Sequence, residues 1–423
     1  MSTTHKFDTL QVHGGFTHDS ATGAAVPPIY QSSSFVFDSS ETAQKLFELD
    51  AQGYIYSRLG NPTVDVLEQR IALLEGGVAA LAVSSGQSAQ LLALATLAER
   101  GHNIVSSPFL YGGTHTLFKD SLSRFGIEVR FAKSDRAEDL APLIDANTRA
   151  IYVETISNPH FSVPDIEAIA KLGNANGIPL VVDNTFGAAG YLCRPIAHGA
   201  AIVVESATKW IGGHGNSLGG VIVDSGNFNW SNGKFPNIAG ASPSYHGLNF
   251  WEKFGAVAFI VKARVEGLRD LGPCLSPFNA FLLLNGVETL SLRAERICSN
   301  ALALAQWLSN HPKVKSVNYA GLPSHPNYQT AQRYLTNGFG GVLSFVPKGG
   351  SAAATAFVDG VKLAKHLANV GDVRTLVIQP SATTHQQLSD GDKQSAGVTE
   401  GLIRVSVGIE ALEDIIRDFD AAL

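Results

Sequence analysis

Lys209 follows directly after an apolar run and two hydroxyl residues, a combination that can anchor an aldehyde and a phosphate. Residues 201–204 read Ala-Ile-Val-Val, Glu205 follows, and the next residues are Ser206-Ala207-Thr208-Lys209. A lysine amine forms a Schiff base with a carbonyl carbon, and the hydroxyls of Ser206 and Thr208 can donate hydrogen bonds to a phosphate. A lone lysine after a strand is usually a surface residue, so its role depends on the rest of the chain.

A carboxylate stands at the end of an earlier apolar run. Residues 179–182 read Pro-Leu-Val-Val and are followed by Asp183, which precedes Lys209 in the chain. An aspartate in this place can keep a pyridine nitrogen protonated, and protonation makes the ring an electron sink. The lysine, the aspartate and the hydroxyls together indicate pyridoxal 5'-phosphate as cofactor and amino acids as substrates.

Two further segments could bind parts of such a cofactor. Ser85-Gly86-Gln87 opens a helix expected over 87–97 directly after a strand. The free N–H groups at a helix N-terminus favour an anion, and glycine lets the backbone approach it. Tyr111 lies in a Gly-rich loop, where its ring could stack on a planar cofactor or pack in a core.

Two arginines could hold anions. Tyr56 and Arg58 offer a phenol and a guanidinium that could clamp a phosphate, although an ordinary surface ion pair fits Arg58 as well. Arg404 lies in the alternating run Leu-Ile-Arg-Val-Ser-Val of residues 402–407. Arginine on a strand usually faces solvent, but its fork of donors suits a substrate carboxylate.

Seven short apolar runs must position these residues. Most of them are separated by helix-length segments, which predicts an α/β domain with a mostly parallel seven-stranded sheet. Ligands of such sheets sit beyond the carboxyl ends of the strands, where Ser85, Asp183 and Lys209 fall. The runs are 81–83, 103–105, 127–129, 150–153, 180–182, 202–204 and 221–223.

The rest of the chain divides into an arm and a smaller domain. Residues 1–62 are rich in turn-formers and are expected to form an arm packed on another body, before a large domain over 63–261. Residues 262–423 are expected to form a smaller α+β domain. Its predicted elements are one long helix over 279–308, strands over 314–319, 341–346, 375–378 and 402–407, and a helix over 412–423.

Composition limits the classes of partner. The chain has 423 residues with a net charge of −6 and 16% charged residues, which provides no basic field for nucleic acid. It lacks an apolar stretch of membrane-spanning length and an N-terminal signal sequence, so we expect a cytoplasmic protein that does not bind membranes. Three dispersed cysteines agree with a reducing compartment.

The ordered motifs resemble the Cys/Met-metabolism family of pyridoxal phosphate enzymes over nearly the whole chain. The resemblance implies an aminotransferase-like (fold type I) large domain and a homotetramer built as a dimer of dimers. Within each dimer, Tyr56 and Arg58 would reach the phosphate of the neighbouring subunit. The motifs are Tyr56-Ser57-Arg58, Ser85-Gly86-Gln87, Tyr111-Gly112-Gly113, Glu154-Thr155 with Asn158-Pro159, Asp183-Asn184-Thr185, Ser206-Ala207-Thr208-Lys209, and residues 404–410.

Within this family, four passages favour the O-acetylhomoserine sulfhydrylases. They are the insertion-like stretch 230–247, residues 367–372 around Asn369, residues 209–215, and residues 380–385. The resemblance implies replacement of acetate on O-acetylhomoserine by sulfide or methanethiol, yielding homocysteine or methionine. Arg404, Asn369 and Asn158 would hold the substrate carboxylate, while Lys209 moves protons and Tyr111 stacks on the cofactor.

Other readings stay open on the sequence. Cystathionine γ-synthases and methionine or cystathionine γ-lyases share the cofactor apparatus, and a catalytically silent amino-acid-binding protein could keep the fold. Residues 215–219 fit the Gly-x-Ser-x-Gly pattern of hydrolases, but a strand rather than a helix is predicted after them. No metal-ligand spacing is present, and His214 and His385 are expected to be structural or to support the site indirectly. The acyl group of the donor, acetyl or succinyl, is left undecided.

Two positions depart from the family pattern. Glu205 and Gln379 stand where relatives often carry histidine. Both are expected near the cofactor, with no role assigned to either.

Overall fold

Seven strands form the larger sheet in the described part of the chain, in the order β1-β7-β6-β5-β4-β2-β3. The computed structural model describes residues 5–383, 386, 391 and 397–423. Each predicted apolar run corresponds to one of these strands, although the run predicted from Ile127 starts before β3 does. They are β1 (Ala79–Val83), β2 (Asn103–Ser106), β3 (Glu128–Phe131), β4 (Thr148–Glu154), β5 (Leu180–Asp183), β6 (Ile202–Glu205) and β7 (Gly220–Asp224).

Most neighbouring strands of this sheet run parallel, as predicted. β3, β2, β4, β5 and β6 pair in parallel, whereas β7 runs antiparallel to both β6 and β1. Because β7 is antiparallel to both of its neighbours, β1 runs in the same direction as β6. The carboxyl ends of β1, β4, β5 and β6 therefore meet at one edge of the sheet.

Helices cover both faces of the sheet, which explains why its central strands are apolar throughout. On one face, α3 (Pro62–Glu75) and α8 (Ile166–Ala175) pack against side chains such as Val182 and Val203. On the other face, α4 (Gly86–Leu97) packs with Val181 and Val204. The Asn61 side chain accepts the N–H of Thr63 and so caps α3.

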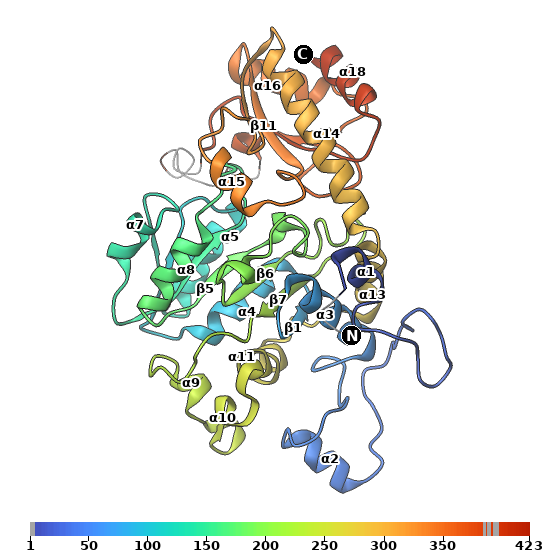
Figure 1. The fold of residues 1–423 in the computed structure, drawn as a ribbon, viewed down its shortest axis with the longest axis vertical. Coiled ribbons are helices and arrows are strands. Elements are labelled where there is room, and N and C mark those ends of the chain that lie inside the picture. The colour runs from blue at the N-terminus through green and yellow to red at the C-terminus, as the bar shows by residue number, and fades with distance from the viewer. Residues whose placement is uncertain (1–4, 384–385, 387–390, 392–396) are drawn as a thin grey trace.

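A second sheet lies in the C-terminal part of the chain, above the larger sheet in Figure 1. Its order is β10-β11-β14-β13-β12. Three helices, α14 (Leu290–Asn310), α16 (Gly350–Gly360) and α18 (Leu412–Ala422), share a core with it. The strands are β10 (Val314–Asn318), β11 (Val342–Pro347), β12 (Lys365–His366), β13 (Leu376–Ile378) and β14 (Ile403–Ser406).

The expected single helix over 279–308 is wrong: two helices form instead, α13 (Pro277–Val287) and α14. The Arg293 guanidinium is buried behind the break and donates to the carbonyl oxygens of Gly286 (2.6 Å) and Trp210 (2.8 Å). The bond to Gly286 satisfies a carbonyl group near the end of α13 that a continuous helix would have paired internally, and the bond to Trp210 links the break to the turn after β6. Because of the break, α13 packs on α3 while α14 extends toward the C-terminal sheet (Figure 1).

The expected boundary at residue 262 falls inside a continuous helical stretch. α11 (Ala258–Lys262) continues through a π-helical segment (Ala263–Leu268) into α12 (Arg269–Leu271). Buried residues of this stretch, such as Phe259 and Leu268, share the core of the larger sheet. Packing thus assigns residues 262–271 to the large domain, and the first helix-breaking pair is Gly272-Pro273.

The N-terminal residues form an arm only in part. α1 (Phe7–His13) packs beside α3 and buries Leu10 in the core of the larger sheet. By contrast, α2 (Ser40–Phe47) and the extended chain around it project from the lower edge in Figure 1.

The insertion-like stretch 230–247 is anchored by aromatic packing. The Trp230 ring stacks on Phe259 at 5.4 Å between centroids and meets Phe235 edge-on at 5.1 Å. The segment carries α9 (Pro236–Ala239) and β8 (Ala241–Ser242). It is followed by β9 (Leu248–Asn249), which pairs with β8, and by α10 (Phe250–Phe254).

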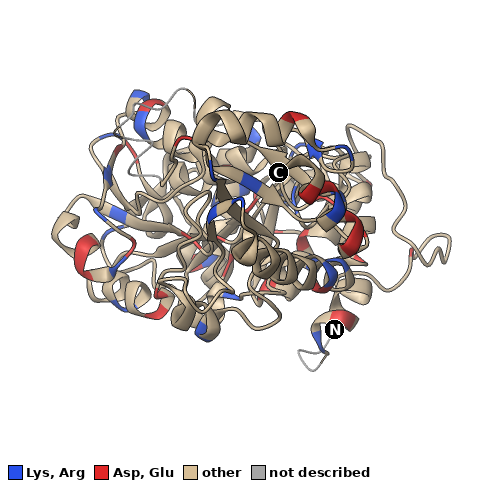
Figure 2. Ribbon diagram, turned by 90° about the horizontal axis from the view of Figure 1, so that it is seen from above, with Lys and Arg blue, Asp and Glu red and all other residues tan. Residues whose placement is uncertain are grey.

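Charges of both signs are interspersed over the molecule, as Figure 2 shows. Among the described residues, no helix has the length and apolar character needed to span a bilayer.

Candidate active site

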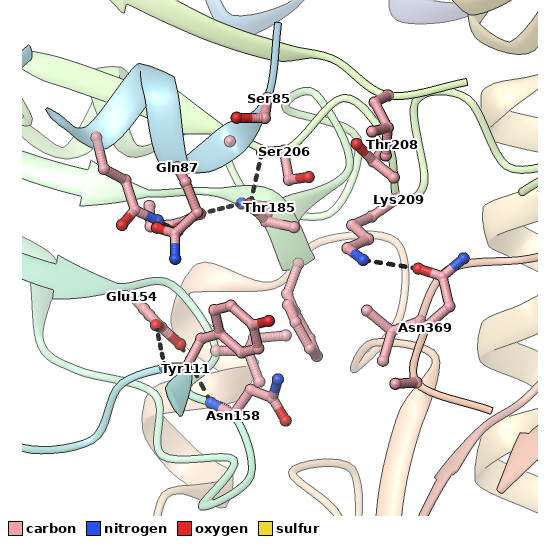
Figure 3. A pocket seen from close by; sticks show the side chains of 18 of the residues that line it. Ser85, Gln87, Tyr111, Glu154, Asn158, Thr185, Ser206, Thr208, Lys209 and Asn369 are labelled. Atoms are coloured by element: carbon pink, nitrogen blue, oxygen red, sulfur yellow. Dashed lines mark hydrogen bonds between the residues drawn. The ribbon is translucent and has the colours of Figure 1, made fainter. Parts of the chain in front are cut away.

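One pocket lies at the edge where the carboxyl ends of β1, β4, β5 and β6 meet. The second body closes it from the opposite side through residues 368–370 and Arg404. Figure 3 shows side chains from both bodies pointing into this space. The lining residues are Ser85, Gly86, Gln87, Gln90, Tyr111, Glu154, Ile156, Asn158, Asp183, Thr185, Phe186, Ser206, Thr208, Lys209, Leu218, Ala368, Asn369, Val370 and Arg404.

The Lys209 amine reaches into the pocket from the turn after β6. Its Nζ donates a hydrogen bond to Oδ1 of Asn369 at 2.7 Å (Figure 3). Burial, together with the nearby charge of Arg404, lowers the pKa of Lys209 to about 8. The amine is therefore far more available as a nucleophile or a base near neutral pH than that of a surface lysine.

The Asp183 carboxylate ends β5 and is 8% exposed. Its Oδ2 accepts hydrogen bonds from Gln90 Nε2 (2.9 Å) and the Tyr152 hydroxyl (3.4 Å), and its Oδ1 accepts the N–H of Thr185 (2.9 Å). Burial raises the pKa of Asp183. Among the described residues, no lysine or arginine forms an ion pair with it, so a cationic ligand atom would meet an uncompensated carboxylate.

The N-terminus of α4 opens onto the pocket. Ser85 caps α4 by accepting the N–H of Ser88 at 3.2 Å, which leaves the first N–H groups of the helix facing the pocket. A Cβ at Gly86 would lie 2.7 Å from Cβ of Ser206, so only glycine allows the helix start and the Ser206 turn to approach this closely. The Thr208 hydroxyl stands beside this turn and accepts the N–H of Gly219 at 3.1 Å.

The Tyr111 ring projects over the pocket from the start of α5 (Gly112–Thr116), as Figure 3 shows. With 41% of its surface exposed, Tyr111 is not a core residue, and the stacking alternative remains. Its backbone N–H donates to Oε1 of the buried Glu154 at 2.6 Å, and the other carboxylate oxygen of Glu154 accepts the N–H of Asn158 at 3.2 Å. Glu154 thus fixes two loops of the pocket at once.

Arg404 is a buried cation that lacks an anion. It lies on β14, is 3% exposed, and donates to Oδ1 of Asn158 and the carbonyl oxygen of Asn369, both at 3.3 Å. Burial lowers its pKa to about 10. No carboxylate of the described chain pairs with its guanidinium, so a carboxylate from outside could take this place.

Tyr56 and Arg58 do not reach this pocket within one chain. Both are exposed on the arm, and the Arg58 guanidinium carbon lies 5.1 Å from the centroid of the Tyr56 ring. Their predicted contact with a phosphate requires a second subunit.

Glu205 and Gln379, expected near the cofactor, do not line the pocket. The side chain of Glu205 is buried beneath the sheet, on the face opposite to Asp183, because side chains alternate along a strand. Gln379 bonds to Ser351 and Thr355 of α16, both at 3.1 Å. Neither side chain can therefore contact a ligand of this pocket directly, and their proximity to a cofactor stays a prediction.

Other sequence motifs have structural explanations. Ser217 lies in the turn before β7, and no helix follows it, so the pattern of residues 215–219 is not a nucleophile elbow. The ring of His214 bonds to the carbonyl oxygen of Gly212 at 2.6 Å, and His385 lies outside the described residues. In the described ranges no group of His, Cys, Asp or Glu could hold a metal ion.

Sequence reasoning missed several lining residues, including Gln90, Thr185 and Phe186. Gln90 had a signal, since it follows Gln87 by one helical turn and so shares its face of α4. Thr185 was part of the quoted Asp183 motif. Its hydroxyl accepts the N–H of Ser206 at 2.8 Å and ties together the two turns that carry Asp183 and Lys209.

These groups fit the parts of pyridoxal phosphate one by one. The α4 start and the neighbouring hydroxyls suit its phosphate, the isolated Asp183 suits a protonated ring nitrogen, and Lys209 suits its aldehyde. Fold and site define a fold type I enzyme that depends on pyridoxal phosphate.

Comparison with known proteins places the chain in a family. A family model described as Cys/Met metabolism PLP-dependent enzyme matches residues 8–423, and the chain belongs to this family. It is 55% identical to a homocysteine synthase of Schizosaccharomyces pombe, with 99% of this chain and 98% of the relative covered. It is 53% identical to O-acetyl-L-homoserine sulfhydrylase 1 of Thermus thermophilus, with 99% of this chain and 100% of the relative covered.

A solved structure shares the complete fold. It is a candidate O-acetylhomoserine (thiol)-lyase of Campylobacter jejuni, described with N'-pyridoxyl-lysine-5'-monophosphate in its chain. The TM-score is 0.96 at 38% identity, and 99% of both chains is covered.

Proposed function

We propose that this enzyme replaces the acetate of O-acetylhomoserine with sulfide, producing homocysteine and acetate. Methanethiol in place of sulfide would produce methionine. The observation that carries the proposal is the unpaired Arg404 guanidinium facing the same pocket as the Lys209 amine. The relatives named homocysteine synthase and O-acetyl-L-homoserine sulfhydrylase support this choice of substrate.

In this proposal, different residues bind the phosphate, the ring nitrogen and the ring of the cofactor. The N-terminus of α4 with Ser85, Gly86 and Gln87 binds the phosphate together with the hydroxyls of Ser206 and Thr208. Asp183 keeps the ring nitrogen protonated, and Tyr111 covers the ring. When bound, the cofactor supplies an electron sink that acidifies protons of the attached amino acid.

The chain's own residues orient the amino acid and move its protons. Arg404 binds the substrate carboxylate in a charge-assisted fork, and Asn158 and Asn369 steady it. The Lys209 amine takes the Cα proton, because a pKa of about 8 leaves a useful neutral fraction near neutral pH. Loss of a Cβ proton then lets acetate leave from Cγ. Sulfide adds at Cγ as HS−, and protons return to Cβ and Cα to give homocysteine.

A panel of acceptors tests this function. Purified enzyme is given O-acetylhomoserine with sulfide, methanethiol, cysteine or no acceptor, and homocysteine, methionine, cystathionine and 2-oxobutanoate are measured. We expect homocysteine from sulfide as the fastest product. Cystathionine as the main product would indicate a synthase, and 2-oxobutanoate without an acceptor a lyase. The Lys209→Ala variant serves as the inactive control, and O-succinylhomoserine tests the acyl group.

We further propose a homotetramer of two intimate dimers in which Tyr56 and Arg58 bind the phosphate in the neighbouring subunit. The projecting arm supports this assembly, because it exposes Val36 (97%) and Phe47 (60%), two apolar side chains that a partner would cover. The free thiols of Cys193, Cys274 and Cys298 support a reducing compartment, and we propose the cytoplasm.

A further inference from the structure

Two glutamates are buried face to face beneath the pocket. Glu75 is the last residue of α3 and Glu205 the last of β6, and they are 0% and 1% exposed. Oε1 of Glu75 accepts a hydrogen bond from Asn184 Nδ2 at 2.6 Å, and Oε2 of Glu205 accepts the N–H of Ala189 at 3.1 Å.

The other two carboxylate oxygens are buried without a hydrogen-bond donor. Oε2 of Glu75 and Oε1 of Glu205 meet no donor in the described part of the chain, yet the two side chains lie within hydrogen-bonding reach. Two ionised carboxylates in this position would repel each other in a dry environment. One proton between them converts the repulsion into a hydrogen bond.

The pair holds together the strand ends that build the active site. Asn184, which donates to Glu75, accepts a hydrogen bond from the Thr155 hydroxyl at 2.6 Å. Thr155 follows β4, Asn184 follows β5, and Glu205 ends β6. Glu205 also holds the N–H of Ala189, whose φ of 51° lies in the left-handed region that alanine rarely adopts.

We propose that Glu75 and Glu205 share a single proton and, as positioning residues, hold the ends of β4, β5 and β6 in the arrangement that binds the cofactor. The proton forms the O–H···O bond between Oε2 of Glu75 and Oε1 of Glu205, and it comes from solvent during folding. The remaining single negative charge is balanced in part by Arg194, while Cys193 and, from the other face of the sheet, Asp183 also interact with the pair electrostatically.

A retained proton has a defined effect on stability. Burial raises the pKa of both carboxyls above the ordinary value of 4.5, so the folded state binds more protons than the unfolded state above that pH. The stabilisation is complete below pH 4.5 and is lost as pH rises through the raised pKa of the pair. Glutamine at either position replaces the proton with an amide donor and removes this dependence.

Three variants of the holoenzyme test the proposal: Glu75→Gln, Glu205→Gln and the double variant, with the exposed Glu413→Gln as control. We measure Tm from pH 5 to pH 8.5, the rate of cofactor release by absorbance, and the infrared band of protonated carboxyl groups at pH 7. Each single variant is expected to lose the same acid band and the same part of the pH dependence of Tm. The double variant is expected to lose no more, because only one proton is shared.

The proposal would be overturned if the two single variants had additive effects on the pH dependence of Tm. It would also be overturned if the infrared band of the protonated carboxyl group remained in both single variants. A Glu205→Ala variant tests the positioning role of Glu205. Its rate of cofactor release should increase several-fold as pH rises, whereas that of Glu205→Gln should not. Equal release from both variants would contradict a positioning role. None of these measurements involves substrate, so their outcome is independent of the proposed reaction.

Discussion

The amine of Lys209 and the side-chain oxygen of Asn369 form a 2.7 Å hydrogen bond between the large domain and the C-terminal body. This bond fixes the amine over the pocket, within the electrostatic influence of Arg404. A residue of the second body thus sets the position of the lysine, and the two bodies must stay docked for the site to exist.

Replacing Asn369 by alanine should lower kcat/KM for O-acetylhomoserine about 10- to 100-fold, the usual effect of losing a hydrogen bond to a charged group. Cofactor content, measured by absorbance, should stay at the wild-type level because the phosphate and ring contacts are intact. Asn369→Ser should restore part of the activity. Wild-type kinetics in Asn369→Ala would show that the bond is dispensable.

Replacing Arg404 by leucine should raise KM about 100-fold or more, since the fork that receives the substrate carboxylate is lost. The same change should raise the Tm of the substrate-free enzyme, because it removes a buried charge that lacks a carboxylate partner. Arg404→Lys should also bind substrate weakly, as an ammonium cannot form the fork. An unchanged KM in both variants would place the carboxylate elsewhere.

Covalent loading of the cofactor-free enzyme should depend on pH with a midpoint near the Lys209 pKa of about 8. The neutral amine is the reactive form, so the rate should fall about tenfold per pH unit below the midpoint and level off above it. Borohydride trapping followed by mass spectrometry measures the rate, with Lys209→Ala as the blank. A midpoint at the ordinary lysine value of 10.5 would contradict the effect of burial.

Gly86→Ala should weaken cofactor binding about 10-fold, because its Cβ would lie 2.7 Å from Cβ of Ser206 and push the start of α4 away. The dissociation constant for pyridoxal phosphate measures this directly. Gly76→Ala is a matched control, since nothing lies within 4 Å of a Cβ there, although its φ of 79° also strains alanine. Equal affinity in Gly86→Ala and wild type would argue against the close approach.

Mixing two inactive variants tests whether subunits share sites. Arg58→Ala and Lys209→Ala homomers should each be nearly inactive, whereas subunits exchanged at equal ratio should regain about one quarter of wild-type activity. Half of the dimers are then mixed, and each mixed dimer holds one site with both native residues. If activity does not recover although subunit exchange is verified, Arg58 does not act in the site of the neighbouring subunit.

Much of the fold was predictable because its signals are local. The strands of the large sheet are continuous apolar runs, and the residues that follow them, such as Asp183 and Lys209, must lie at the ligand-binding edge. The break between α13 and α14 was not predictable, because it depends on Arg293 reaching carbonyl groups of a distant turn.

The buried contacts beneath the site were equally unpredictable from the sequence. Glu75 and Glu205 are far apart in the sequence, and nothing in either neighbourhood indicates that they meet. Burial of Gln379 against α16 likewise arises from tertiary packing. Sequence could thus place the reactive groups but not the contacts that hold them in position.

The antiparallel strand β7 also sets the width of the cofactor site. It starts with Gly220 at the edge where β1 and β6 end, and Gly219 directly precedes it. A Cβ at Gly220 would lie 2.0 Å from the carbonyl oxygen of Ser85, so a side chain there would separate the start of α4 from the turn that carries Lys209. The glycine at the start of the antiparallel strand β7 therefore allows the start of α4 and the turn that carries Lys209 to lie close together.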